Sequence, residues 1–182
     1  PAEQEQTAVM RNSMLVYGLT YDDHRRMAES IKQVRQAAPA KIIRKEARLR
    51  ERSMELRVVG TTPEWFELVP RHVEAGRVLL RADEEKKAPV AVLTEFGARK
   101  LLATQSTIGQ TLRIGGNEFE IVGIIRNESG QAGNIQLPDQ EADVYIPLQV
   151  ARRYYGDIFA RVTSGSFERE RVELHQIIVQ VD

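Results

Sequence analysis

Residues 112–121 have the sequence LRIGGNEFEI, and this stretch decides the β part of the fold. Apolar and polar or charged side chains alternate on both sides of Gly115-Gly116-Asn117. Alternation places the apolar side chains on one face of a strand, and the three central residues tolerate the positive φ of a tight turn. We therefore predict a β-hairpin here.

Short apolar runs and helix signals follow one another on both sides of this hairpin. Residues 89–93 form an apolar run of strand length, and Thr94 is a suitable N-cap for a helix after it. Residues 143–146 predict a strand, followed by a short helix that ends at Gly156. Residues 172–181 predict a final, mostly buried strand.

The N-terminal third predicts one helix and a pair of strands. Thr20 and Asp23 have the spacing of a capping box, and apolar residues recur after them at helical spacing. This helix is expected to continue until Ala37-Ala38-Pro39 stops the pattern. Residues 41–59 mix alternation with helix-forming residues, and we interpret them as two strands that turn near residues 50–53.

Four shorter predictions complete the secondary structure. Residues 14–17 favour a strand, and Thr62 is placed to cap a short helix that begins at Pro63. A loop is expected from Pro70 to Gly76. Residues 127–134 have no periodicity and many turn residues, so they predict an exposed loop. The elements together indicate an α+β fold class.

The composition excludes several classes of protein. The chain has 182 residues, with 26 Lys and Arg balanced by 26 Asp and Glu, and it has no Cys. This length allows one domain or two small ones without a disulfide or metal, and the zero net charge disfavours nucleic acid as a main partner. Without Cys there is no thiolate metal site. The uncharged run at 101–112 is shorter than the ~18 apolar residues of a membrane span.

No catalytic, cofactor-binding or metal-binding residues are predicted. His24, His72 and His175 lack paired metal-ligand spacing, and no G-x-S-x-G motif is present. The glycines of the hairpin join two strands, so they are not placed to bind a phosphate at a helix start. The sequence also begins at Pro1 without Met, which suggests a piece of a longer protein.

A basic stretch between residues 41 and 57 has two interpretations. It is either a surface for a polyanion or a solvated strand face, and we favour the second because no aromatic residues are interleaved. Its carboxylates are Glu46, Glu51 and Glu55. Its cations are Lys41, Arg44, Lys45, Arg48, Arg50, Arg52 and Arg57.

Six segments carry a further signal in their order along the chain. They lie at residues 19–23, 59–66, 76–77, 90–93, 108–125 and 144–148. Each segment alone is a weak signal, whereas their order and spacing are more specific. This order resembles the extracytoplasmic domain of MacB-type ABC transporter permeases, over nearly the whole chain.

The resemblance implies two subdomains. Residues 1–59 and 164–182 would form a porter-like α/β subdomain, which is expected to be incomplete at its C-terminal end. Residues 60–163 would form a smaller inserted subdomain rich in β-structure. A partner-contact loop is expected at Asn127, Gln131, Asn134 and Asp139.

The resemblance also implies a function outside the cytoplasmic membrane, in a permease that dimerises. The domain would transmit ATP-driven motion to a substrate or periplasmic partner during efflux or extraction, while a separate domain or subunit hydrolyses ATP. Its implied partners are the permease membrane segments, a second permease copy, that ATPase, and a periplasmic membrane-fusion protein or lipoprotein. It implies no enzyme activity, cofactor or nucleic acid. The alternatives are a soluble α+β hydrolase and a nucleic-acid-binding module.

Overall fold

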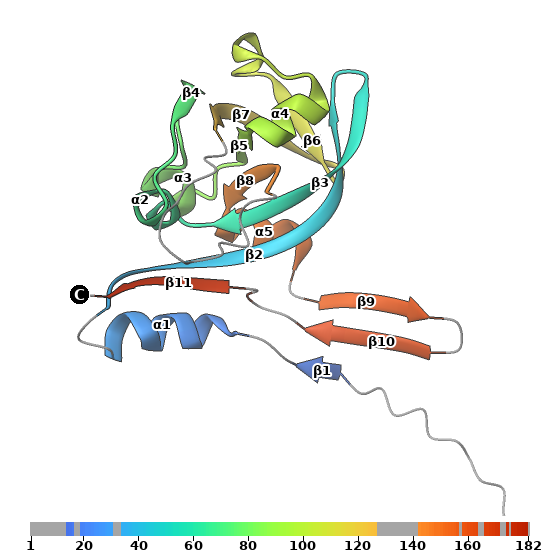
Figure 1. The fold of residues 1–182 in the computed structure, drawn as a ribbon. Helices are drawn as coiled ribbons and strands as arrows, with labels where there is room; N and C mark the ends of the chain where they lie inside the picture. Colours follow the sequence, from blue (N-terminus) through green and yellow to red (C-terminus); the bar gives the residue numbers. More distant parts are fainter. Residues whose placement is uncertain are drawn as a thin grey trace, which may run out of the picture.

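The computed structural model describes residues 14–16, 19–30, 34–126, 142–156, 158–163, 166–171, 174 and 176–181. Figure 1 shows a mixed α+β fold, which confirms the predicted class. The strands are β1 (Met14–Val16), β2 (Val34–Leu49), β3 (Arg52–Thr61), β4 (Val73–Gly76), β5 (Val90–Thr94), β6 (Thr111–Ile114), β7 (Asn117–Ile125), β8 (Val144–Pro147), β9 (Ile158–Thr163), β10 (Ser166–Arg171) and β11 (Gln176–Val181). The helices are α1 (Tyr21–Ser30), α2 (Glu64–Leu68), α3 (Arg81–Glu85), α4 (Glu95–Leu101) and α5 (Leu148–Tyr155), with a 3₁₀ turn at Gln105–Thr107.

Six strands are hydrogen-bonded in a closed ring. β2 pairs with β3, β3 with β8, and β8 with β5. β5 then pairs with β7, β7 with β6, and β6 with the C-terminal end of β2. A closed ring satisfies backbone groups that an open sheet would leave at its edges. This ring is therefore the rigid centre of the fold.

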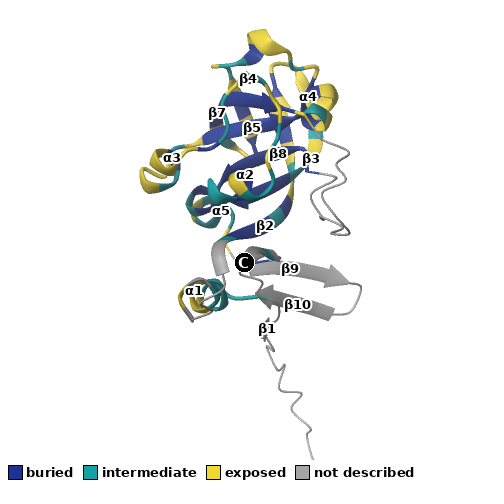
Figure 2. Ribbon diagram, turned by 60° about the vertical axis from the view of Figure 1, so that its left-hand side comes forward, coloured by how far each residue is buried: buried dark blue, intermediate teal, exposed yellow. Residues whose placement is uncertain are grey.

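Two hydrophobic cores lie on opposite faces of the ring strands. In β5, Ala91 and Leu93 belong to one core, and Val92 belongs to the other. Helices α4 and α5 contribute to the first core, while Trp65 and Phe66 of α2 contribute to the second. Because successive strand residues point to opposite faces, this arrangement explains why all of β5 is buried (Figure 2).

The long strand β2 connects the ring to the rest of the molecule. Its first part pairs with β11, and its last residues pair with β6. Helix α1 packs against β2, and Figure 1 shows it on the same side of the molecule as the three-stranded sheet of β1, β10 and β9. Among the helices that the structure describes, none has the length and apolar character needed to span a membrane. Strand β2 therefore links helix α1 to the ring.

Several local predictions are confirmed. The hairpin is formed by β6 and β7, with Gly115 at φ 52° and Gly116 at φ 88°. The capping box is present, since the Asp23 backbone N–H donates to Thr20 Oγ1 at 3.0 Å and the Thr20 N–H donates to Asp23 Oδ2 at 2.9 Å. The Thr94 hydroxyl accepts from the Gly97 N–H at 3.2 Å, as expected for an N-cap.

Long-range strand pairing overturns two predictions and adds two strands that the sequence did not predict. The first helix ends at Ser30, and Ala37-Ala38-Pro39 lie within β2 because they pair with β11. The expected loop before Gly76 contains strand β4, which pairs with β7. A further strand pair, β9 with β10, precedes the predicted C-terminal strand. Pairing between distant segments overrides local sequence preference in the two overturned predictions.

The predicted Thr62 cap is wrong. Pro63 occupies the N-cap position of α2, and Thr62 Oγ1 is buried without a hydrogen-bond partner in the structure. The Thr62 carbonyl accepts from the Trp65 N–H at 3.0 Å instead, because Pro63 already has helical dihedral angles. The predicted loop at 127–134 lies outside the described residues. The two-subdomain division stays a prediction, and Gly60 lies within β3.

Candidate functional site

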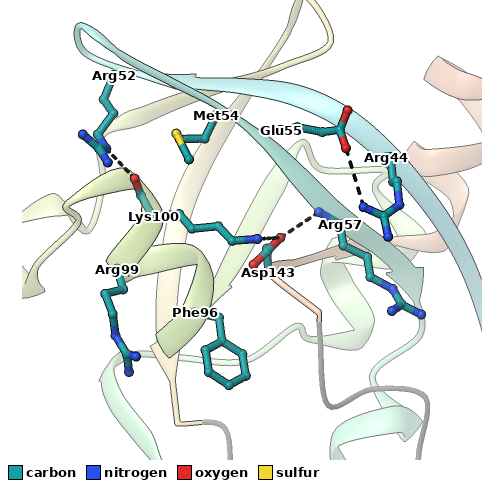
Figure 3. Close-up of a pocket in the computed structure, with 9 residues that line it drawn as sticks. All are labelled: Arg44, Arg52, Met54, Glu55, Arg57, Phe96, Arg99, Lys100 and Asp143. Carbon is teal, nitrogen blue, oxygen red and sulfur yellow. Dashed lines mark hydrogen bonds and ion pairs between the residues drawn. The ribbon is translucent and has the colours of Figure 1, made fainter.

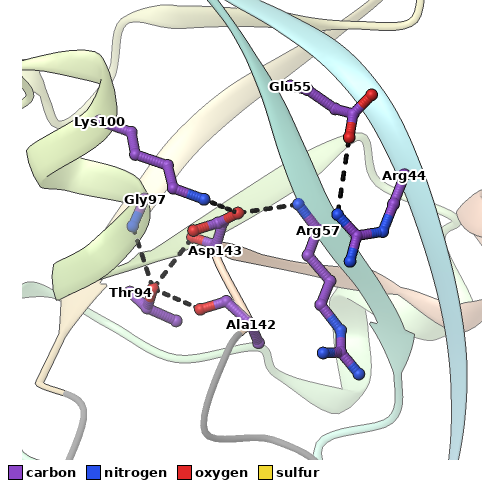
Figure 4. A network of polar contacts seen from close by, with 8 residues as sticks. All are labelled: Arg44, Glu55, Arg57, Thr94, Gly97, Lys100, Ala142 and Asp143. Atoms are coloured by element: carbon purple, nitrogen blue, oxygen red, sulfur yellow. Dashed lines mark hydrogen bonds and ion pairs between the residues drawn. The ribbon is translucent and has the colours of Figure 1, made fainter.

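A buried carboxylate joins two strands of the ring to helix α4. The Asp143 side chain is 2% exposed, and its Oδ2 accepts from the Arg57 backbone N–H and from Lys100 Nζ, both at 2.8 Å. These groups lie on β3 and α4, while Asp143 immediately precedes β8. Figure 4 shows the contacts. A carboxylate with two short, charge-assisted bonds fixes α4 against β3.

Backbone contacts reinforce this junction from the other side. The Thr94 hydroxyl donates to the Ala142 carbonyl at 2.7 Å, and the Thr94 N–H donates to the Asp143 carbonyl at 3.0 Å. The Asp143 N–H donates to the Arg57 carbonyl at 3.0 Å. Residues 142–143 are therefore bound to β3 and β5 as well as to α4. We call this set of contacts the Asp143 junction.

An open pocket of about 560 Å³ lies beside the Asp143 junction, between β3 and α4. Figure 3 shows its side chains around Asp143. They combine a positive charge excess with two apolar side chains. The lining residues are Arg44, Arg52, Met54, Glu55, Arg57, Phe96, Arg99, Lys100 and Asp143.

The predicted solvated strand face is only partly correct. Arg44 and Arg52 are exposed, but Lys41 is fully buried because it shares a face of β2 with Ile43 of the first core. The stretch also has an aromatic neighbour, Phe96, which the fold brings from α4. Its neighbours across the pocket come from α4 and from Asp143, far from the stretch in sequence, so no local pattern indicated the pocket.

The structure places two of the three histidines, His24 in α1 and His72 just before β4. His24 Nε2 lies 3.2 Å from the Ala37 carbonyl, and His72 accepts a backbone bond from Arg126 through its carbonyl. His175 and the predicted contact residues Asn127, Gln131, Asn134 and Asp139 lie outside the described residues. Within the part of the chain that the structure describes, no three His, Asp or Glu side chains are grouped as metal ligands.

The partly buried Glu84 has the largest carboxyl pKa shift of the described residues. Burial raises the pKa of Glu84 from 4.5 to about 7. Hydrogen bonds from the Gln149 and Leu148 backbone N–H groups lower this pKa and only partly offset the effect of burial. Glu64 raises this pKa further and Arg152 lowers it. The Gln149 N–H donates to Glu84 Oε1 at 3.1 Å, so Glu84 lies at the start of α5.

Glu84→Gln is expected to stabilise the protein at pH 8 and to have little effect at pH 4.5. The folded state binds the Glu84 proton more tightly than the unfolded state does. Protonated Glu84 therefore stabilises the fold below pH 4.5, and this stabilisation is lost as the pH rises through about 7. Gln keeps the acceptor without the charge. Because Glu84 is partly solvated, we expect a gain of only about 1 kcal/mol. Urea unfolding at both pH values measures it, and an equal effect at both would contradict it.

Comparison with known proteins gives consistent matches. The family model of the MacB-like periplasmic core domain matches residues 3–181. The macrolide export ATP-binding/permease protein MacB of Bdellovibrio bacteriovorus is 23% identical over 143 residues, which cover 79% of this chain and 21% of that protein. The chain thus spans about a fifth of the length of the curated relatives it matches.

Two crystal structures share the fold. The extracellular domain of the noncanonic ABC-type transporter YknZ from Gram-positive bacteria has a TM-score of 0.68 and 16% identity, over 90% of this chain and 73% of that one. The periplasmic region of MacB from Actinobacillus actinomycetemcomitans has a TM-score of 0.67 and 16% identity, over 90% of this chain and 65% of that one.

Proposed function

We propose that this domain transmits ATP-driven motion to a substrate or a periplasmic partner, because the chain belongs to the family of MacB-like periplasmic core domains. The domain lies on the extracytoplasmic side of the membrane, as part of a MacB-like ABC transporter permease. The observation that carries the proposal is the family match across residues 3–181. ATP hydrolysis would occur in a separate domain, and this domain would need no catalytic centre.

The fold supports movement as one body. The closed ring around the first core leaves no strand within it free to slide, and β2 pairs with β3 without interruption from Ala40 to Leu49. The Asp143 junction fixes α4 to the same ring. Packed interiors of this kind transmit displacement rather than absorb it. A push at the α1 and β11 end of β2 would therefore move the ring as a unit.

A distance measurement between the two copies in the assembled transporter tests this proposal. A spin label at Glu29→Cys lies on the exposed side of α1, in a chain with no native Cys. ATP binding is expected to shift the distance between the labels of the two copies, because the domains change position relative to each other.

A second pair of labels supplies the matched control. Glu29→Cys and Glu118→Cys in the same copy span the molecule from α1 to the β6–β7 hairpin, and both sites are exposed. Their separation is expected to stay constant when ATP binds. An unchanged distance between copies would contradict the transmission of motion, and a changed distance within one copy would contradict movement as one body.

A further inference from the structure

The pocket beside the Asp143 junction has an excess of positive charge. Five cationic side chains line it against two carboxylates. Each of these carboxylates already has a cation, since Asp143 is 2.8 Å from Lys100 and Glu55 is 3.6 Å from Arg44. Among the described lining residues, neither carboxylate lacks a positive neighbour, so the electrostatic field of the described lining favours an incoming anion.

Two arginines are well placed to bind an anionic head group. Arg52 donates from Nε to the Lys100 carbonyl, a neutral acceptor, so this bond leaves its charge uncompensated. Arg99 pairs with Glu95 at 2.8 Å on the helix surface, where the two side chains are 66% and 41% exposed. An exposed ion pair of this kind contributes at most about 1 kcal/mol to the stability of the fold. Either guanidinium can turn toward a ligand at little cost.

An apolar surface lies among these cations. Phe96 is 37% exposed, and Met54 is partly buried. The Arg99 guanidinium carbon lies 5.8 Å from the centroid of the Phe96 ring. In Figure 3, Met54 and Phe96 lie on opposite sides of the Lys100–Asp143 contact, with Arg52 and Arg99 on the α4 side. A ligand that contacts them removes apolar surface from water while its charge stays near a guanidinium.

We propose that this pocket binds small anionic amphiphiles, which carry one negatively charged head group on an aliphatic or aromatic body. The volume of about 560 Å³ falls in the range of roughly 300–1,000 Å³ typical of small-molecule sites. The charge excess selects the head group, and Phe96 and Met54 bind the apolar body. This binding is independent of the proposed transmission of motion.

Calorimetric titration of the 182-residue chain with three probes tests the proposal. Decanoate carries both features, decyltrimethylammonium has the same chain with the opposite charge, and acetate has the head group without the chain. We expect decanoate to bind at least about tenfold more tightly than decyltrimethylammonium, and acetate to show no measurable binding. Equal affinity for the two decyl compounds would overturn the proposal.

Variants assign the binding to this pocket. Arg52→Gln with Arg99→Gln is expected to weaken decanoate binding about tenfold, since both guanidinium groups are lost. Arg113→Gln is the matched control, because Arg113 is an exposed arginine paired with Glu118 outside the pocket, and it is expected to change nothing. All these arginines are exposed, so the variants are expected to fold.

A chain-length series gives a second reading of the same site. Phe96→Ala is expected to reduce the gain in affinity between octanoate and decanoate, because part of the apolar contact is removed. If the double arginine variant bound decanoate as tightly as the unmodified protein does, the proposal would be overturned. So would binding of an acidic peptide, rather than decanoate, that depends on Arg52 and Arg99.

Discussion

Gly97→Ala is expected to destabilise the protein by about 3 kcal/mol, a large share of the roughly 5–15 kcal/mol that stabilises a typical domain. A Cβ at Gly97 would lie 2.0 Å from the Asp143 carbonyl oxygen and 2.8 Å from its carbonyl carbon. Both are backbone atoms held by the Asp143 junction, so neither can move without breaking contacts to Thr94 or Arg57. Helix propensity alone would favour alanine by about 1 kcal/mol, so close approach determines the sign.

Urea unfolding followed by the fluorescence of Trp65 measures this effect, since Trp65 is the single tryptophan and is 2% exposed. Gly116→Ala is the matched control. A Cβ there meets nothing within 4 Å, but Gly116 has φ 88°, so the variant reports the cost of the backbone conformation alone, about 1–2 kcal/mol. If Gly97→Ala destabilised the protein no more than Gly116→Ala does, α4 would not be fixed in close contact with residues 142–143.

Features set by neighbouring residues were predictable from the sequence. The hairpin follows from alternation around two glycines, and the Thr20–Asp23 box follows from residues three apart. The Thr94 cap is equally local. In each case the residues that make the contact lie within a few positions of one another, so their pattern is visible in one short stretch.

Features set by distant residues were not predictable in the same way. Closure of the ring requires the end of β2 to meet β6 across more than sixty residues, and no periodicity encodes that pairing. Asp143 is the first residue of the predicted strand at 143–146, but its partners Arg57 and Lys100 lie 86 and 43 residues away. Lys41 was expected in solvent because of its charge, whereas its position on the inner face of β2 buries it.

Covalent linkage of the two copies of the domain is expected to abolish transport in the assembled transporter. If motion passes through the domain as one body, a disulfide that fixes the separation of the copies blocks the step that ATP binding drives. The exposed side of α1 offers Arg25 and Glu29 for engineered cysteines. Arg25 pairs with Asp22 where both side chains are exposed, and Glu29 is exposed, so each substitution is expected to cost within about 0.5 kcal/mol.

Single-cysteine variants that have been alkylated provide the control, because they carry the same substitutions without a link between copies. They are expected to transport at the unmodified rate. Nucleotide binding is expected to be the same in the linked and control transporters, since the link lies outside the ATPase. A link that abolished nucleotide binding would indicate damage to the assembly, so the comparison requires both measurements.

The transport rate of the linked transporter, compared with the same preparation after reduction of the disulfide, tests the transmission of motion most directly. We expect background transport while the copies are linked and recovery of the full rate after reduction. Full transport with the copies linked in every register tested would contradict the proposal that this domain transmits motion by changing its position.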